Sequence, residues 1–164
     1  MTEVLFRNRF RIPSSRLPGW DYRRGSYCVT VCTHEKVCWL GELRQGEVIL
    51  SGCGVIVAER WAGIARHCVS VRLDEWVVMP NHLHGILHLE PSQVSEPAQT
   101  LGQIIGGFKA ASSRRIWLAG HKGFRWQSRF YDQLIRDDEA LFNFRRYILD
   151  NPRRWDDDRY HPQT

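Results

Sequence analysis

Three histidines alternate with apolar residues in the segment VVMPNHLHGILHLE, residues 77–90. Side chains two apart in a β-strand project from the same face of a sheet, so His82, His84 and His88 share one face. Two neighbouring imidazoles can hold a divalent metal ion and leave positions open for a further protein ligand and for substrate oxygens. The alternative is two partly buried histidines satisfied by hydrogen bonds, but the apolar residues on the opposite face favour the metal site.

The third histidine is expected to play no part in that site. His88 lies roughly 13 Å beyond His84 at the usual rise of a strand, which is too far for one ion to reach both side chains. We therefore expect His88 at the sheet surface. In the same strand, Gly85 leaves room for another element to approach the backbone.

A tyrosine and an amide occur at helical spacing near the C-terminal end. Tyr147 and Asn151 are four residues apart in a segment predicted to form a helix from about Asp137, so their side chains share one helix face. A tyrosine in such a place usually packs the helix against a sheet. A phenol beside a divalent cation can instead act as a nucleophile, because the cation favours the phenolate and neutralises charge on a phosphate under attack. This second interpretation depends on the histidine pair.

The elements that must position these side chains are identified from apolar periodicity and turn residues. The long helix is predicted to start after the N-cap Thr100, and its Gly106-Gly107 pair indicates close packing against the sheet. In chain order the predicted elements are a strand (26–32), a hairpin (37–43 and 47–51), a helix (55–66), strands (69–73, 75–79 and the histidine strand), the long helix (from 101), a strand (129–135) and the last helix. This order predicts an α+β fold with helices on an antiparallel sheet.

Basic residues outnumber acidic ones, 23 to 18, and the pI near 9.2 favours an anionic partner such as nucleic acid. The first 24 residues interleave arginines with aromatic rings. Arginine contacts phosphates and aromatic rings stack on unpaired bases, although a solvated tail that caps the sheet edge is the alternative. The residues predicted to contact DNA are Arg7, Arg9, Arg11 and Arg16 in this arm, and Lys109, Arg114 and Arg115 on the long helix.

The remaining composition narrows the class of protein. Five cysteines without a CxxC pair predict reduced thiols rather than a disulfide framework or a zinc ribbon. No apolar run approaches the roughly 20 residues of a membrane span, so we expect a cytoplasmic protein without membrane contact. The 164 residues suit one domain, and we divide them into a basic arm (1–24), a central domain (25–155) and a tail (156–164) whose three aspartates, 156–158, we expect to be solvated.

Four blocks of the sequence resemble the REP-associated tyrosine transposases, which are relatives of the single-tyrosine insertion-sequence transposases in the HUH endonuclease superfamily. The blocks occur in the family's order and span nearly the whole chain. They are RLPGWDY (16–22), LDEWVVMPNHLHGI (73–86), GFKAASSRRI (107–116) and FYDQLIRDDEALFNFRRYILDNPRRW (130–155).

The resemblance implies a ferredoxin-like, RRM-related core that acts as a homodimer or as a monomer. It implies cleavage and joining of single-stranded DNA at hairpins such as repetitive extragenic palindromes. His82 and His84 match the family's metal-binding motif, and Tyr147 matches the nucleophile that forms a 5′-phosphotyrosine. Asn151 stands where transposase relatives carry a glutamine that completes the metal site. The expected metal is Mg²⁺ or Mn²⁺; imidazole ligands alone would suit Mn²⁺ or Zn²⁺ better, since Mg²⁺ prefers oxygen ligands.

Two functions from different classes stay open on the sequence alone. A metal-dependent endonuclease that transfers DNA strands requires His82, His84 and Tyr147, and all three residues are present. A non-catalytic protein that binds hairpin DNA would keep the fold and the basic surface. The asparagine at position 151, in place of the glutamine of the transposase relatives, keeps this second function open. A metal-dependent hydrolase of an unrelated substrate fits poorly with a resemblance along the whole chain.

Overall fold

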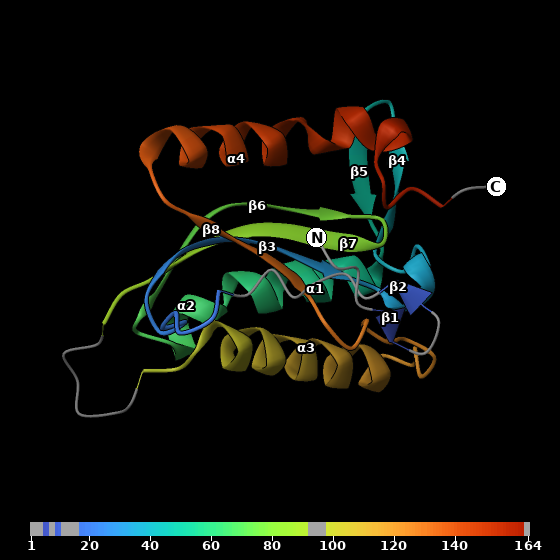
Figure 1. Ribbon diagram of the computed structural model, residues 1–164. Coiled ribbons are helices and arrows are strands. Elements are labelled where there is room, and N and C mark those ends of the chain that lie inside the picture. The colour runs from blue at the N-terminus through green and yellow to red at the C-terminus, as the bar shows by residue number, and fades with distance from the viewer. Residues whose placement is uncertain (1–4, 7–8, 11–16, 92–97, 163–164) are drawn as a thin grey trace.

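The computed structural model describes residues 5–6, 9–10, 17–91 and 98–162. Its centre is a four-stranded antiparallel sheet with the strand order β6-β7-β3-β8 (Figure 1). The strands are β3 (Gly25–Cys32), β6 (Val71–Met79), β7 (His82–Leu89) and β8 (Tyr131–Ile135). Two short hairpins, β1 (Leu5–Phe6) with β2 (Arg9–Phe10) and β4 (Gly41–Arg44) with β5 (Glu47–Leu50), complete the described strands.

Helices cover both faces of this sheet (Figure 1). On one face lie α1 (Gly52–Ala62), α2 (Ile64–His67) and α3 (Leu101–Leu118), and on the other lies α4 (Asp138–Asp150). The short 3-10 turn η1 (His34–Lys36) follows β3, and η2 (Asn151–Asp157) continues α4 beside the β4–β5 hairpin. The predicted α+β fold with an antiparallel sheet is confirmed.

The two faces of β7 contact different apolar clusters, so all eight of its residues are buried. Leu83 and Leu87 face α1 and α3 in the larger cluster, as their parity predicts. The histidine face packs under α4, where the smaller cluster consists of Cys28, Ile86, Ile135 and Ile148. The histidines therefore lie between the sheet and a helix, and not on an open sheet surface.

The helix boundaries follow their capping residues. Asp137 and Thr100 accept hydrogen bonds from the first turns of α4 and α3, as the sequence predicts, and Thr100 forms a capping box with Gln103. Helix α1 begins earlier than predicted because Ser51 accepts a bond from the backbone N–H of Gly54. The two strands predicted over 69–79 form the single strand β6, whose pairing with β7 is interrupted between Leu73 and Trp76.

Gly85→Ala is expected to destabilise the fold by about 1–3 kcal/mol, because an added methyl group in a well-packed core forces neighbouring side chains and backbone to shift. A Cβ at Gly85 would lie 2.3 Å from Cζ2 of Trp61, which packs from α1 onto the backbone of β7. This close approach confirms the role expected for the glycine. Denaturant unfolding of both proteins measures the change, and an unchanged midpoint would contradict the packing.

Gly106→Ala is the matched control for that substitution. A Cβ at Gly106 or Gly107 meets nothing within 4 Å, so the expected close packing of this pair against the sheet is wrong. Both glycines lie on the exposed side of α3. Alanine at 106 should therefore stabilise the protein by up to about 1 kcal/mol through helix propensity.

Among the described residues, no helix is long and apolar enough to cross a membrane.

Candidate active site

The imidazoles of His82 and His84 meet at the C-terminal end of β3 and the start of β7. Their Nε2 atoms lie 3.0 Å apart, and both side chains are almost completely buried. The other ring nitrogens are held by neighbouring side chains: Nδ1 of His82 lies 2.8 Å from Oδ1 of Asn81, and Nδ1 of His84 lies 2.8 Å from Oγ1 of Thr30. Such contacts fix the orientation of the rings, as they do for imidazoles that bind metal.

The hydrogen bonds of Asn81 determine which nitrogen of His82 carries the proton. The amide nitrogen of Asn81 donates to the carbonyls of Lys36 and Tyr160, so its Oδ1 is an acceptor. His82 must then donate from Nδ1, which leaves the lone pair of Nε2 directed toward His84. An unprotonated Nε2 is the form of imidazole that ligates a metal ion.

Burial keeps both rings neutral. It lowers the pKa of His84 to about 3, and burial together with the repulsion that a protonated His84 would exert lowers the pKa of His82. The two rings thus need no deprotonation before they bind a cation at neutral pH.

Two oxygen donors stand beside the imidazoles. Asn151, the first residue of η2, is buried and its side chain interacts with His82 and Tyr147, while its Oδ1 has no well-formed hydrogen bond among the described residues. Asp158 places Oδ2 3.8 Å from Nε2 of His82, with only 4% of its side chain exposed. A buried carbonyl oxygen without a partner costs free energy, and a bound cation would remove that cost.

Asp158 corrects the expectation of a solvated tail. The ligand atoms of His82, His84 and Asp158 lie within 4.8 Å of one another and could hold a metal ion. Only Asp156 and Asp157 are exposed as predicted. The chain turns back after η2, and Trp155 and Tyr160 pack their rings against His82 at centroid distances of 6.0 and 4.7 Å. No periodicity in the sequence indicates this turn.

Tyr147 projects from α4 toward the histidine pair. Its hydroxyl lies 3.4 Å from Nε2 of His84, and 39% of the residue is exposed, so a substrate can reach it. Burial of the ring and the charge of Asp158 raise the pKa of Tyr147. A positive charge at the neighbouring histidines would oppose this shift. The structure therefore brings together the three residues on which the sequence-based mechanism depends, within one chain.

Two cationic side chains that the sequence did not point to, Arg159 and Lys36, also line the candidate site. Arg159 lies over the rings of Tyr160 and Tyr131, at 4.7 and 5.7 Å from their centroids. Lys36 donates from Nζ to the carbonyl of Arg159 at 2.9 Å. Burial lowers the pKa of both histidines and the charge of Arg159 adds to this effect, whereas for Tyr147 the same charge partly opposes the rise in pKa. The site thus combines side chains that could hold a metal ion, a phenol and cations that suit a phosphate.

One known protein resembles this chain in sequence along most of its length. No family model matches the chain. A protein of Haemophilus influenzae strain Rd, described as uncharacterized, is 32% identical over 162 residues, which cover 88% of this chain and 90% of that protein. This chain belongs to the same family as the Haemophilus protein.

Solved structures with a similar fold identify the fold of this chain. The structure of a REP-associated tyrosine transposase bound to a REP hairpin matches 85% of this chain and 73% of its own, with a TM-score of 0.60 and 20% identity. This chain has the fold of a REP-associated tyrosine transposase. A putative transposase from Deinococcus radiodurans R1 matches with a TM-score of 0.51 and 18% identity, over 82% of this chain and 95% of that one. The resemblance carried by the four sequence blocks is confirmed at the level of the fold.

Within this transposase fold, His88 is not at the sheet surface as we expected. It is buried under α4, with Nδ1 2.6 Å from Oγ of Ser26 and Nε2 2.8 Å from Oδ2 of Asp74. Asp74 sits where the pairing of β6 is interrupted, and it accepts two hydrogen bonds from Arg145 of α4, at 2.8 and 2.7 Å. This network ties α4 to the sheet two residues before Tyr147.

Asp74→Asn is expected to lower the free energy of unfolding at pH 7 by about 1–3 kcal/mol, because charged hydrogen bonds at a side chain that is only 8% exposed are weakened. Hydrogen bonds from Arg145 hold the pKa of Asp74 well below its usual value. The ionised carboxylate therefore stabilises the folded protein fully above about pH 4. This contribution to the free energy of unfolding is lost as the pH falls further and the carboxylate is protonated.

Unfolding measured from pH 7 down to pH 2 tests the prediction. The wild-type protein should lose more stability below pH 4 than the Asp74→Asn variant does. Asp156→Asn is the control, since that side chain is 94% exposed and should change stability by no more than about 0.5 kcal/mol. Parallel pH profiles for the wild type and Asp74→Asn would count against the network.

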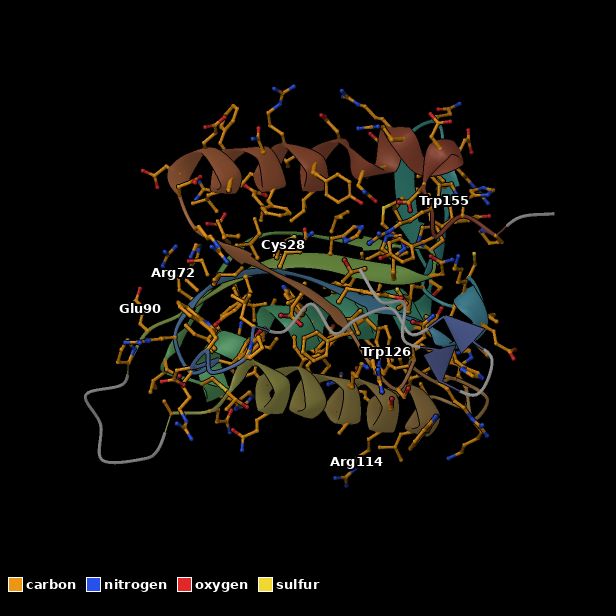
Figure 2. The ribbon with its side chains drawn as sticks, in the orientation of Figure 1. Cys28, Arg72, Glu90, Arg114, Trp126 and Trp155 are labelled. Carbon is orange, nitrogen blue, oxygen red and sulfur yellow. The ribbon has the colours of Figure 1, made fainter. Side chains whose placement is uncertain are left out.

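The three basic residues of α3 that were predicted to bind DNA differ in their contacts. Lys109 donates to the backbone carbonyls of Gln127 and Arg129, at 2.6 and 2.9 Å, and so connects α3 to the segment before β8. Arg115 forms an ion pair with Glu59 at 3.6 Å, and Arg114 points away from the sheet on the outer side of α3 (Figure 2). Cys28, by contrast, lies between the sheet and α4 (Figure 2).

The N-terminal arm is described in part. Arg7, Arg11 and Arg16 lie outside the described residues, and Arg9 is described only as a backbone position in β2. Their predicted contacts with DNA stay a prediction.

Proposed function

We propose that this protein is a single-strand DNA endonuclease and strand transferase that acts at DNA hairpins and uses Tyr147 as its nucleophile. The observation that carries the proposal is the 3.4 Å distance between the Tyr147 hydroxyl and Nε2 of His84, in a group of side chains suited to a metal ion. The likeness to a transposase structure bound to a REP hairpin supports hairpin DNA as the partner. The protein would meet this DNA in the cytoplasm.

In the proposed reaction, the phenolic oxygen of Tyr147 attacks the phosphorus of the scissile phosphate. A bond forms between that oxygen and phosphorus, and the bond from phosphorus to the 3′ oxygen of the preceding nucleotide breaks. The phenol proton passes to solvent, and the departing 3′ oxygen takes up a proton. The products are a 5′-phosphotyrosine and a free 3′-hydroxyl, and the retained phosphoester can be used to join strands.

His82 and His84 would hold the divalent ion, and Asn151 and Asp158 could each add an oxygen ligand. When bound, the ion would neutralise charge on the phosphate and favour the phenolate. Two imidazole nitrogens with amide and carboxylate oxygens suit Mn²⁺ better than Mg²⁺, which prefers oxygen ligands only. Asn81 and Thr30 would keep the imidazoles oriented for this role.

A single chain contains all the residues of this proposal. The histidine pair, Tyr147, Asn151 and Asp158 belong to one protomer, so a homodimer is not needed to complete the site. We therefore propose that the protein can act as a monomer, with cleavage in cis. A mixture of Tyr147→Phe and His84→Ala chains tests this, because complementation between two inactive variants would require a shared site.

The decisive experiment is incubation of the protein with single-stranded hairpin DNA from the sequence that flanks its gene, in the presence of Mn²⁺. A denaturing gel should show a DNA-linked protein band that disappears with a chelator. Hairpin binding without a covalent product under any divalent metal would instead favour the non-catalytic binding protein.

The arm should add phosphate contacts to hairpin binding. Replacing Arg7, Arg9 and Arg11 with Gln should weaken binding and flatten the plot of log affinity against log salt by about 0.7–0.9 per lost phosphate contact. Arg66→Gln, a change at an exposed residue of α2, serves as the control and should leave the slope unchanged. If the triple variant shows the wild-type slope, these arginines do not contact phosphates. The result would then favour the alternative, in which the arm is a solvated tail that caps the sheet edge. We propose that Arg114 and Arg115 of α3 also contact DNA, away from the candidate active site.

A further inference from the structure

A cleft of about 920 Å³ extends from the candidate active site along the edge strand β8. His84 and Tyr147 line it together with Cys28 and Thr30 of β3. One wall is α4 and the other is β8, which among the described strands pairs with β3 alone and forms an edge of the sheet. DNA bound with its scissile phosphate at Tyr147 would have adjoining nucleotides in or beside this cleft.

Two side-chain amides line the cleft from opposite walls. Gln133 of β8 lies opposite Cys28 and shares its face, and Asn143 belongs to α4. Both residues are exposed, and neither side-chain amide has a hydrogen-bond partner among the described residues. Each amide offers a donor and an acceptor at fixed spacing, which is the combination that recognises the edge of a base.

The spacing of these amides suits a nucleotide next to the cleavage site. Asn143 precedes Tyr147 by four residues, so it lies on the same helix face about one turn, roughly 5.4 Å, away. One helical turn is comparable to the length of a single nucleotide in an unstacked strand. Gln133 is two residues from Tyr131 on the same side of β8, and Tyr131, which is 42% exposed, also lines this cleft.

We infer that Gln133 and Asn143 recognise, by hydrogen bonds, the unpaired base that adjoins the scissile phosphate, and that Tyr131 stacks on this base. The inference rests on the proposed function and assigns sequence preference at the cleavage site to these two residues. Stacking on an aromatic ring tolerates every base, whereas amide hydrogen bonds distinguish bases. Affinity for the DNA strand should therefore depend on Tyr131, whereas preference among the four bases should depend on Gln133 and Asn143.

The first test measures covalent product in single turnover, with hairpin substrates that carry each of the four bases on either side of the scissile phosphate. The wild-type protein should prefer one base at one of the two positions by about tenfold or more over the worst base. The double variant Gln133→Leu with Asn143→Leu should reduce this ratio to about twofold or less. Gln45→Leu, in the β4–β5 turn away from the cleft, should keep the wild-type ratio. A wild-type protein without preference, or a double variant that retains it, would overturn the inference.

A binding test separates failure of this inference from failure of the proposed chemistry. Fluorescence anisotropy with the Tyr147→Phe protein and the same DNA measures base preference without any cleavage. The preference in affinity should persist in this background and disappear when both amides are replaced. Tyr131→Ala should weaken binding of all four substrates by a similar factor and leave their ratio unchanged. Equal affinities for all bases in the Tyr147→Phe protein would reject recognition by the amides, even if wild-type protein cleaves no DNA.

Discussion

Tyr147→Phe is expected to abolish the covalent protein–DNA product and leave hairpin binding nearly unchanged. The substitution removes the oxygen that would attack phosphorus, and loss of a nucleophile typically costs about three orders of magnitude in rate or more. The ring remains, and its contact with His84 at a centroid distance of 5.1 Å is kept. The measurement is adduct yield over time on a denaturing gel, with affinity for the hairpin determined in parallel.

Tyr131→Phe provides the matched control, because it removes a hydroxyl from the other wall of the same cleft. That variant should form the adduct at close to the wild-type rate. Should Tyr147→Phe still become linked to DNA, another residue would be the nucleophile and the proposed mechanism would be wrong.

Joint replacement of His82 and His84 by Ala should eliminate metal-dependent cleavage and weaken Mn²⁺ binding by more than about 100-fold. Both nitrogen ligands are lost, and the oxygens of Asn151 and Asp158 alone form a poor site. Calorimetric titration with Mn²⁺ measures the affinity, and adduct yield across metal concentrations measures the activity. Thermal unfolding without metal shows whether the variant still folds.

His88→Asn is the control for the paired substitution. His88 is a third buried histidine on the same face of β7, but its contacts are Ser26 and Asp74. This variant should bind Mn²⁺ with wild-type affinity even where its stability is reduced. Full cleavage activity in the His82 and His84 double variant would refute the assignment of the metal ligands.

The strand and helix patterns of the site were predictable because they depend on short-range geometry. Alternation along β7 placed His82 and His84 together and Leu83 on the opposite face, as the structure has them. Helical spacing likewise joined Tyr147 to Asn151, and Asp137 marked the start of their helix. The repeat of a strand or helix is a property of the backbone, so neighbours a few residues apart can be inferred without the fold.

The same local reasoning failed for residues whose surroundings come from distant parts of the chain. His88 was expected at the surface because nothing near it in sequence predicts that α4 covers this face of the sheet. Its partner Asp74 and the arginine that completes the network come from two other elements. Asp158 was expected in solvent because a run of aspartates beyond a helix is usually exposed. Its burial depends on the turn that packs Trp155 and Tyr160 over the histidines.

By itself, the sequence determined which chemical groups are available and which of them share a strand face or a helix face. Only the tertiary structure decided that Tyr147 reaches His84 across 63 residues of chain, and that the side chains of Asp158 and Asn151 lie beside the same pair of imidazoles. The physical reason is the range of the forces involved. Backbone geometry repeats within a few residues, whereas the position of α4 over the sheet results from burial and hydrogen bonds summed over many elements.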